Sequence, residues 1–275
     1  MKLINKTYIK KIVKQALQED LSPHGDITSI LINNKKCFAN IIANQNGILS
    51  GLDFCKNTFK TIDRKAIFIK KFKDGDRITK GDTVAIIKAK AKSILTAERT
   101  ALNFLGHASG ISTTTNLFVQ KVKKKSKICC TRKTSPNLRL LEKYAVKRGG
   151  GINHRFNLSD EIMIKDNHIK LEKSLRSLIK KAIKRKKIIT VEIDKVFQLK
   201  EILGLKFKRI LFDNMSIKTL KTCLKLCKNK YETEYSGNVN LGNIKKISNT
   251  RVNRISIGSL THSSKSFDFT LDLIN

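Results

Sequence analysis

Short apolar runs alternate with amphipathic segments of helical period from about residue 112 onward. Apolar runs bounded by polar turns predict buried strands, and the segments between them predict helices. This alternation is typical of a parallel sheet with helical crossovers. The expected strands are 127–131, 161–165, 188–193, 209–213, 231–236 and 254–259, and the expected helices are roughly 172–186, 195–203, 216–228 and 240–248, with Ser216 and Asn240 as N-caps of the last two.

A different pattern precedes residue 110. Short runs at 38–53 and 82–91 predict strands mixed with helices in a smaller α+β domain, and a long helical stretch at 93–123 leads into the following region. The start lacks the apolar core of a signal peptide, and no apolar run approaches the ~20 residues of a membrane span. We interpret the first twenty residues as an amphipathic helix of the fold, the alternative being a membrane-surface helix. Its apolar face holds Ile9, Ile12, Val13, Ala16 and Leu17.

Chemically capable residues gather where the predicted strands end. Because the carboxyl ends of parallel strands meet at one edge of a sheet, these groups should converge there. An open doubly wound sheet collects ligands only around its switch point, so groups from six strands favour a closed or nearly closed α/β barrel. In strand order they are Arg132 and Lys133, Lys165, Glu192, Asp213, Ser236 and Gly237, and Gly258 and Ser259.

The stretch from Thr131 to His168 concentrates cations around three successive glycines. Arginine forks and lysine charges recognise carboxylates and phosphates, and glycine lets a backbone approach a ligand closely. The stretch therefore predicts a small, polyanionic substrate held by several groups at once. Its cations include Arg132, Lys133, Arg139, Arg148, Arg155 and Lys165, and its glycines are Gly149, Gly150 and Gly151.

Some polar residues of this stretch are expected to be structural. We interpret Arg139, Lys143 and Arg148 as helix-face or structural charges rather than substrate contacts. His168 is expected to hold a loop by hydrogen bonds rather than to act in catalysis. The strand-end residues Glu192 and Asp213 could pair with Lys165 inside a barrel, but their position favours a role in the site.

The net charge is +35, from 57 Lys and Arg against 22 Asp and Glu. Such an excess is compatible with nucleic-acid binding. The lysines, however, are spread over nearly every segment, aromatic residues make up only 6% and Trp is absent, so no basic and aromatic platform stands out. We interpret the excess as solvated surface that can draw anionic substrates to the site, and we expect no specific nucleic-acid partner.

Six cysteines occur without a CxxC pair. This spacing favours reduced, buried thiols over zinc ligands or disulfides and predicts a cytoplasmic protein. The cysteines are Cys37, Cys55, Cys129, Cys130, Cys223 and Cys227.

Eight segments, in order and spanning nearly the whole chain, form a specific combination: EDLSPHGDITS (19–29), LTAERTALNFLGHASGI (95–111), TRKTSPNLRLLEKYAVKRGGGINHRF (131–156), IKDNHI (164–169), VEID (191–194), LFDNMS (211–216), SGNV (236–239) and ISIGSLTHS (255–263). The combination resembles the quinolinate phosphoribosyltransferases, or carboxylating nicotinate-nucleotide pyrophosphorylases. The resemblance implies that quinolinate and phosphoribosyl pyrophosphate react to give nicotinate mononucleotide, pyrophosphate and carbon dioxide, a step of de novo NAD synthesis.

The resemblance also implies the architecture and the partners. The fold would be an incomplete seven-stranded α/β barrel over residues 112–264, with a smaller N-terminal α/β sandwich over 1–111 that the tail 265–275 completes. Mg²⁺ would bind together with the pyrophosphate substrate. The protein would be a homodimer with shared active sites, with assembly beyond the dimer left open and no membrane association.

For quinolinate, the resemblance implies a cationic pocket. Arg132, Arg155 and Lys165 match its carboxylate ligands. His154 matches a pocket histidine, and Arg99 matches the arginine that reaches into the partner subunit's site. A dianion with two carboxylates calls for separate cationic clamps, which agrees with this number of cations.

For phosphoribosyl pyrophosphate, the resemblance implies an acidic pair and phosphate-binding loops. Glu192 and Asp213 match the pair that handles the ribose hydroxyls and, through the pyrophosphate, the magnesium. Lys133 matches a lysine near quinolinate and the phosphates, and we expect it to be catalytic together with the acidic pair. The other implied substrate contacts are Thr131, Ser236, Gly237, Asn238, Ile257, Gly258 and Ser259.

Three positions depart from the family pattern. Asn238 and Asn137 stand where glycine is usual, and Tyr235 stands where a small residue is common. Because Asn tolerates left-handed backbone geometry, we expect the loops to survive. Two other functions stay open: a related phosphoribosyltransferase acting on nicotinate or another aromatic acid, and a basic RNA-binding protein. Paired clamps favour a dicarboxylate, and strand-end carboxylates disfavour RNA.

Overall fold

The computed structural model describes residues 4–21, 23–172 and 174–274. The chain divides into two compact units, one from residues 1–116, 134–150 and 260–275 and the other from 117–133 and 151–259. The boundaries expected from the sequence, 1–111 and 112–264, stay a prediction of domain organisation.

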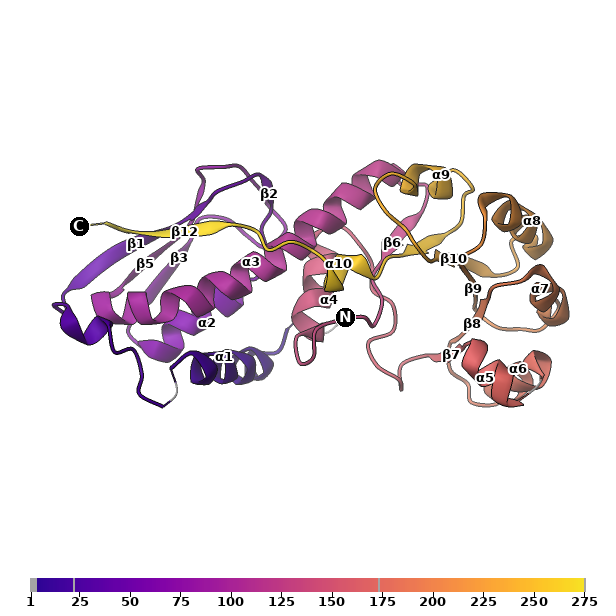
Figure 1. The fold of residues 1–275 in the computed structure, drawn as a ribbon, viewed down its shortest axis with the longest axis horizontal. Coiled ribbons are helices and arrows are strands. Elements are labelled where there is room, and N and C mark those ends of the chain that lie inside the picture. The colour runs from indigo at the N-terminus through magenta and orange to yellow at the C-terminus, as the bar shows by residue number, and fades with distance from the viewer. Residues whose placement is uncertain (1–3, 22, 173, 275) are drawn as a thin grey trace. The chain divides into compact units, whose positions relative to one another are not determined.

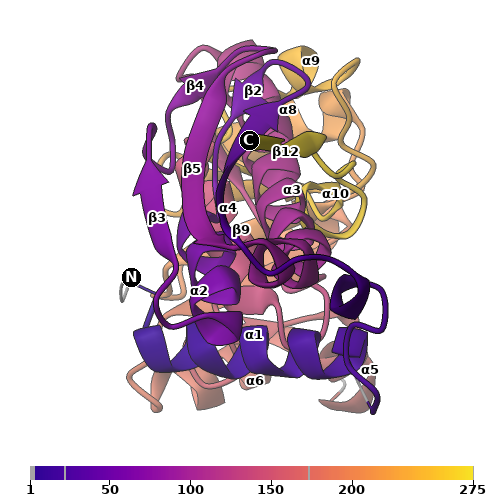
Figure 2. The ribbon, with the colours of Figure 1, turned by 90° about the vertical axis from the view of Figure 1, so that its left-hand side faces the viewer.

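The first unit is built on an antiparallel sheet with the strand order β12-β1-β5-β3. Two helices, α2 and α3, cover one face of this sheet (Figure 1, Figure 2). A separate two-stranded antiparallel sheet pairs β2 with β4. The elements are α1 (Lys6–Leu21), η1 (Ser29–Leu31), β1 (Lys36–Ala43), β2 (Gly47–Ile48), α2 (Leu52–Ile62), β3 (Ile67–Lys70), β4 (Arg77–Ile78), β5 (Thr83–Lys90), α3 (Ala91–Val122), α4 (Arg139–Arg148), α10 (Ser259–His262) and β12 (Phe269–Ile274).

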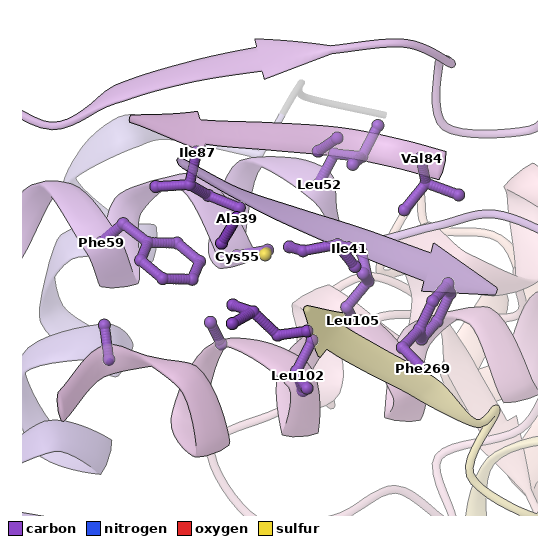
Figure 3. Close-up of a cluster of buried hydrophobic side chains, with 14 of the residues drawn as sticks. Ala39, Ile41, Leu52, Cys55, Phe59, Val84, Ile87, Leu102, Leu105 and Phe269 are labelled. Carbon is purple, nitrogen blue, oxygen red and sulfur yellow. The ribbon is translucent and has the colours of Figure 1, made fainter. Parts of the chain in front are cut away.

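Alternation along β1 explains how this unit forms its core. Ala39, Ile41 and Ala43 are fully buried, whereas the residues between them are not. Successive strand residues point to opposite faces, so one face of the sheet is apolar. Side chains from this face, α2 and α3 point toward one another, among them Ile41, Phe59 and Leu105 (Figure 3).

The C-terminal tail belongs to the same sheet. Strand β12 pairs antiparallel with β1, with Phe38 opposite Ile274 and Ala43 opposite Phe269. Phe267 and Phe269 stack with ring centroids 4.7 Å apart and lie in the core cluster. Burial of these two rings stabilises the pairing of β12 with β1.

Helix α1 is a helix of the fold, as its apolar face predicts. Ile9, Ile12, Val13 and Leu17 are buried, and the helix packs on α2. The Tyr8 ring lies edge to face with the Phe54 ring of α2, with the ring centroids 6.1 Å apart. In the described part of the chain, no helix is both long and apolar enough to cross a membrane.

The second unit contains six parallel strands in the order β6-β11-β10-β9-β8-β7. Helices lie along the outer side of the curved sheet (Figure 1). This confirms the α/β architecture. The elements are β6 (Lys127–Cys129), β7 (Ile162–Ile164), α5 (Asp166–Glu172), α6 (Leu175–Ile183), β8 (Ile189–Ile193), α7 (Val196–Ile202), β9 (Arg209–Asp213), α8 (Ile217–Cys227), β10 (Glu232–Ser236), α9 (Ile244–Ser248) and β11 (Arg254–Ser256).

The ring of strands is incomplete. A seventh position is present as a single parallel bridge between Cys129 of β6 and Ile152. Within the described residues, β7 ends the six-stranded sheet on one side, and no ladder joins it to Ile152. The parallel sheet therefore curves without closing.

Several element boundaries differ from the sequence prediction. Strands β6 and β11 end before Cys130 and Ile257, so Arg132 and Gly258 lie in the following loops. The expected helix 172–186 starts later, at Leu175, because the Ser174 side chain caps it by accepting from Ser177 N at 3.2 Å. A short helix, α5, precedes it and was not expected.

One of the two predicted N-caps is wrong. Ser216 caps α8 by accepting from Thr219 N at 3.1 Å. Asn240 instead closes the turn before α9, because its Oδ1 accepts from the backbone N of Gly242 at 2.9 Å and of Asn243 at 3.1 Å. An asparagine that bonds to the backbone two residues on favours a turn over a helix start.

Candidate active site

The predicted strand-end residues of the second unit converge at one edge of the parallel sheet. Lys165 directly follows β7, Glu192 lies in β8, and Asp213 and Ser236 end β9 and β10. The ladder pairs Asp213 with Ser236, and it pairs Glu192 with Leu211, two residues before Asp213. Parallel register thus brings these four side chains to neighbouring positions on the carboxyl side.

An ion pair joins the first two of these residues. Lys165 Nζ lies 3.1 Å from Glu192 Oε2, with the lysine side chain 42% exposed and the glutamate side chain 16% exposed. Burial raises the pKa of Glu192, Lys165 opposes this, and the negative charge of Asp213 adds to the rise. Two carboxylates that repel each other beside one lysine form a site suited to a cationic partner.

The next strand end carries a loop held by asparagines. Ser236 Oγ donates to Asp213 Oδ1 at 2.5 Å, and Asn214 N donates to Ser236 O at 2.9 Å. Asn238 Nδ2 donates to Asn214 Oδ1 at 3.2 Å. Asn238 has a φ of +48° and so adopts the left-handed backbone where glycine was expected. The substitution is accommodated without loss of the turn.

Gly237 makes the closest backbone approach in this loop. Its φ is +101°, and a Cβ built on it would lie 2.1 Å from Asn214 Oδ1. Glycine is therefore required here both by conformation and by space.

A second cluster surrounds Arg155. Its Nη1 donates to Glu161 O at 3.0 Å, and its backbone N donates to His154 Nδ1 at 2.8 Å. The pKa of Arg155 is lowered, first by burial and then by the positive charge of Arg132, while Glu161 and Glu192 oppose this. Two guanidinium groups that repel each other would both be stabilised by an anion between them.

The loop after β6 carries the two remaining cations predicted for the site in the second unit, Arg132 and Lys133. Lys133 N donates to Thr131 Oγ1 at 3.1 Å, which shapes a tight turn, and the Lys133 side chain is exposed. Beside this loop, Ile257 N donates to Cys129 O at 2.9 Å and extends the pairing of β11 with β6. Gly258 and Ser259 follow, both partly exposed.

Arg99 lies in the first unit, on α3, and its side chain is exposed. The structure thus places the predicted site residues in two units, with Arg99 in the first and all the others in the second.

Residues interpreted as structural have structural contacts. Arg139 Nε donates to Thr134 Oγ1 at 3.0 Å, and the Arg148 guanidinium lies 4.7 Å from the centre of the Tyr144 ring. Lys143 is buried at 1% exposure. His168 Nδ1 accepts from Lys165 N at 3.1 Å, which confirms that it holds the loop after β7.

Sequence reasoning missed a buried charged cluster at the amino ends of the parallel strands. Arg209 pairs with Glu161 at 2.8 Å and with Glu232 at 2.9 Å. Arg254 Nη1 lies 3.8 Å from the Glu232 carboxylate. The available signal was charged residues spaced by two inside strands, as in Glu232 and Glu234, because such spacing directs them to one face.

Five of the six cysteines are buried, as expected, and Cys37 is half-buried. Their redox state stays a prediction. No group of three or more His, Cys, Asp or Glu side chains that could hold a metal ion occurs in the described residues. Glu192 and Asp213 supply the oxygen donors that Mg²⁺ prefers.

Comparison with known proteins decides the family. The profile "Quinolinate phosphoribosyl transferase, C-terminal domain" matches residues 111–272, and the corresponding N-terminal domain profile matches residues 26–109. The chain belongs to the quinolinate phosphoribosyltransferase family.

Individual members of the quinolinate phosphoribosyltransferase family match this chain over almost its full length. A Bacillus subtilis protein named probable nicotinate-nucleotide pyrophosphorylase (carboxylating) is 40% identical, covering 98% of this chain and 95% of the relative. The Francisella tularensis nicotinate-nucleotide pyrophosphorylase structure matches with a TM-score of 0.96 at 32% identity, covering 99% of this chain and 98% of that one. The Ehrlichia chaffeensis structure matches with a TM-score of 0.94 at 38% identity, covering 100% of both chains. The chain is therefore a phosphoribosyltransferase of this family.

Proposed function

We propose that the protein transfers the phosphoribosyl group of phosphoribosyl pyrophosphate to quinolinate, and that decarboxylation then gives nicotinate mononucleotide, pyrophosphate and carbon dioxide for de novo NAD synthesis. The observation that carries the proposal is the convergence of a cationic cluster and an acidic pair at one sheet edge. The family membership of the whole chain supports the same reaction.

The cationic cluster suits the dicarboxylate. Arg132 and Arg155 would bind one carboxylate, and Lys165, half-exposed at the strand end, would bind the other. His154 would line the pocket, and Arg99 of a second subunit would complete it. Two separate clamps orient the ring nitrogen toward the ribose C1.

The acidic pair suits the sugar substrate. Glu192 and Asp213 would bind the ribose hydroxyls and hold Mg²⁺ through the pyrophosphate, and the bound ion would neutralise the charge of that leaving group. Lys133 would contact the pyrophosphate beside Thr131. The loops at Ser236–Asn238 and Ile257–Ser259 would bind the 5′-phosphate through backbone N–H groups.

The chemistry balances without a redox cofactor. The ring nitrogen forms a bond to ribose C1 while the bond from C1 to the pyrophosphate oxygen breaks, through a transition state with oxocarbenium character. The ribosylated nitrogen is cationic and withdraws electrons. The bond from ring C2 to its carboxylate then breaks, carbon dioxide leaves, and the electron pair at C2 takes up a proton.

The assembly and location follow from the same proposal. The match of Arg99 to the family arginine that reaches into the partner subunit's site motivates a homodimer in which each site draws on both subunits. Six cysteines outside any disulfide, most of them buried, support a reducing, cytoplasmic location.

Product measurement tests the proposed reaction. Purified protein with quinolinate, phosphoribosyl pyrophosphate and Mg²⁺ should release carbon dioxide and nicotinate mononucleotide in equal amounts. Nicotinate should react poorly, because a half-buried cationic clamp left without its carboxylate costs ~1–3 kcal/mol, about tenfold or more in kcat/KM. Comparable kcat/KM values for the two acids would refute dicarboxylate specificity.

Substitution of Gly237 tests the proposed phosphate loop. Gly237→Ala should raise the KM for phosphoribosyl pyrophosphate about tenfold, because an added Cβ displaces Asn214 and left-handed strain costs ~1–3 kcal/mol. Asn238→Gly is the matched control and should keep the KM, since glycine adopts the same φ freely. Equal KM values for Gly237→Ala and the unsubstituted enzyme would remove this loop from the site.

A further inference from the structure

A fully buried carboxylate, Glu234, lies in β10 two residues before the phosphate loop begins. Its Oε1 accepts a short hydrogen bond from Ser256 Oγ and lies 3.5 Å from His154 Nε2. Its Oε2 faces two arginine Nε atoms, at 3.6 Å in Arg209 and at 3.8 Å in Arg254. The mechanism above does not use this group.

The contacts of His154 select one form of its ring. Nδ1 accepts from the backbone N of Arg155 at 2.8 Å, so Nδ1 carries no proton. In the neutral imidazole the proton is then on Nε2, the atom that faces Glu234. A carboxylate at this position stabilises that tautomer and fixes the plane of the ring.

Arg155 is anchored to the same buried cluster at both ends. Its backbone N is held by His154, and its guanidinium donates to Glu161 O at 3.0 Å. The Glu161 side chain is in turn held by Arg209 Nη1 at 2.8 Å and by Thr190 Oγ1 at 2.5 Å. The orientation of Arg155 therefore depends on groups that would not touch the substrate.

We infer that Glu234 is a positioning residue for the carboxylate clamp: it faces the Nε2–H group of His154 and holds the imidazole ring in its plane, and His154 in turn holds Arg155 in place to receive the acid substrate. The inference rests on the proposed function, which places Arg155 in the quinolinate pocket. It predicts an effect on the acid substrate that is not shared by the sugar substrate.

The chain offers a matched control two residues earlier in the same strand. Glu232 contacts the same two arginines, Arg209 at 2.9 Å and Arg254 at 3.8 Å. The Glu232 carboxylate contacts the two arginines. The Glu234 carboxylate contacts them too, and it also lies 3.5 Å from His154 Nε2. A comparison of Glu234→Gln with Glu232→Gln thus separates an effect through His154 from a general loss of charge pairing.

Steady-state kinetics provides the first readout. In Glu234→Gln the KM for quinolinate should rise about tenfold, while the KM for phosphoribosyl pyrophosphate stays unchanged. Glu232→Gln should leave both values near those of the unsubstituted enzyme. Because positioning through His154 is a shared pathway, Glu234→Gln combined with His154→Gln should be no worse than His154→Gln alone.

The ¹⁵N spectrum of histidine-labelled protein gives the second readout, and the chain has only five histidines. The His154 Nε2 signal should be the same in the unsubstituted and Glu232→Gln proteins and should shift in Glu234→Gln, because the carboxylate that faces Nε2 is lost there. An unchanged His154 signal in folded Glu234→Gln, or equal KM effects of the two glutamate substitutions, would overturn the inference. If His154→Gln and Arg155→Ala themselves leave the quinolinate KM unchanged, the proposed site fails instead.

Discussion

Mixing an Arg99→Ala protein with a Lys165→Ala protein should restore activity that neither homodimer has alone. Arg99 is exposed on α3 of the first unit, and Lys165 follows β7 of the second. If each site takes Arg99 from one subunit and Lys165 from the other, a mixed dimer has one doubly defective site and one intact site. Random exchange at equal amounts then makes about a quarter of all sites intact.

Specific activity after subunit exchange is the measurement, with two affinity tags to verify that mixed dimers have formed. The matched control mixes Lys165→Ala with Lys133→Ala. These two residues would come from the same subunit's barrel, so neither site of that mixed dimer is intact and no activity should return. Recovery in the control, or none in the Arg99 and Lys165 mixture after verified exchange, would contradict a shared site.

The sequence predicts the parallel sheet from two features: the apolar runs of its strands and the turn or capping residues that follow them. Most predicted strands contain an apolar run, the clear exception being 231–236 with Glu232 and Glu234, and most are followed by a turn residue or a helix cap such as Ser216. The polar residues at strand ends, among them Lys165 and Asp213, then follow from topology alone, because parallel strands end at one edge. Local pattern and topology together are enough to place the strand-end part of the candidate site, whereas Arg99 and His154 came from the family resemblance.

The buried cluster could not be predicted in the same way. Arg209 and Glu161 are 48 residues apart, and their contact depends on the curvature of the sheet rather than on local pattern. Strand ends were also missed where pairing stops before the apolar run does, as in β11, which ends at Ser256. Asn240 shows a local competition, since the same side chain can start a helix or close a turn, and here it closes a turn.

The charge of the chain calls for a distinction between surface and site. The net charge is +35, yet the proposed site uses few of these cations. Exposed charges act over distance, and salt largely screens them beyond a Debye length of ~8 Å at physiological ionic strength. A cation in hydrogen-bond contact with a substrate is screened much less. These two kinds of charge should therefore respond differently to neutralisation and to salt.

Lys133→Ala should abolish turnover, whereas neutralising Lys180, Lys184 and Lys221 together should not. All four side chains are exposed, but Lys133 follows the strand edge of the proposed site and the other three belong to α6, its C-cap and α8. We expect kcat to fall at least ~10²-fold in Lys133→Ala, the size typical of a lost charge-stabilising contact. The measurement is kcat and kcat/KM at low and high salt, with circular dichroism to confirm folding.

The triple lysine variant gives the decisive comparison. It removes three charges where Lys133→Ala removes one, so a general electrostatic role would make it the more damaging variant. We expect it instead to keep kcat and to lose only a salt-sensitive part of kcat/KM, because steering affects the encounter and not the bound complex. A folded triple variant whose kcat falls as far as that of Lys133→Ala would give the surface lysines a direct part in turnover.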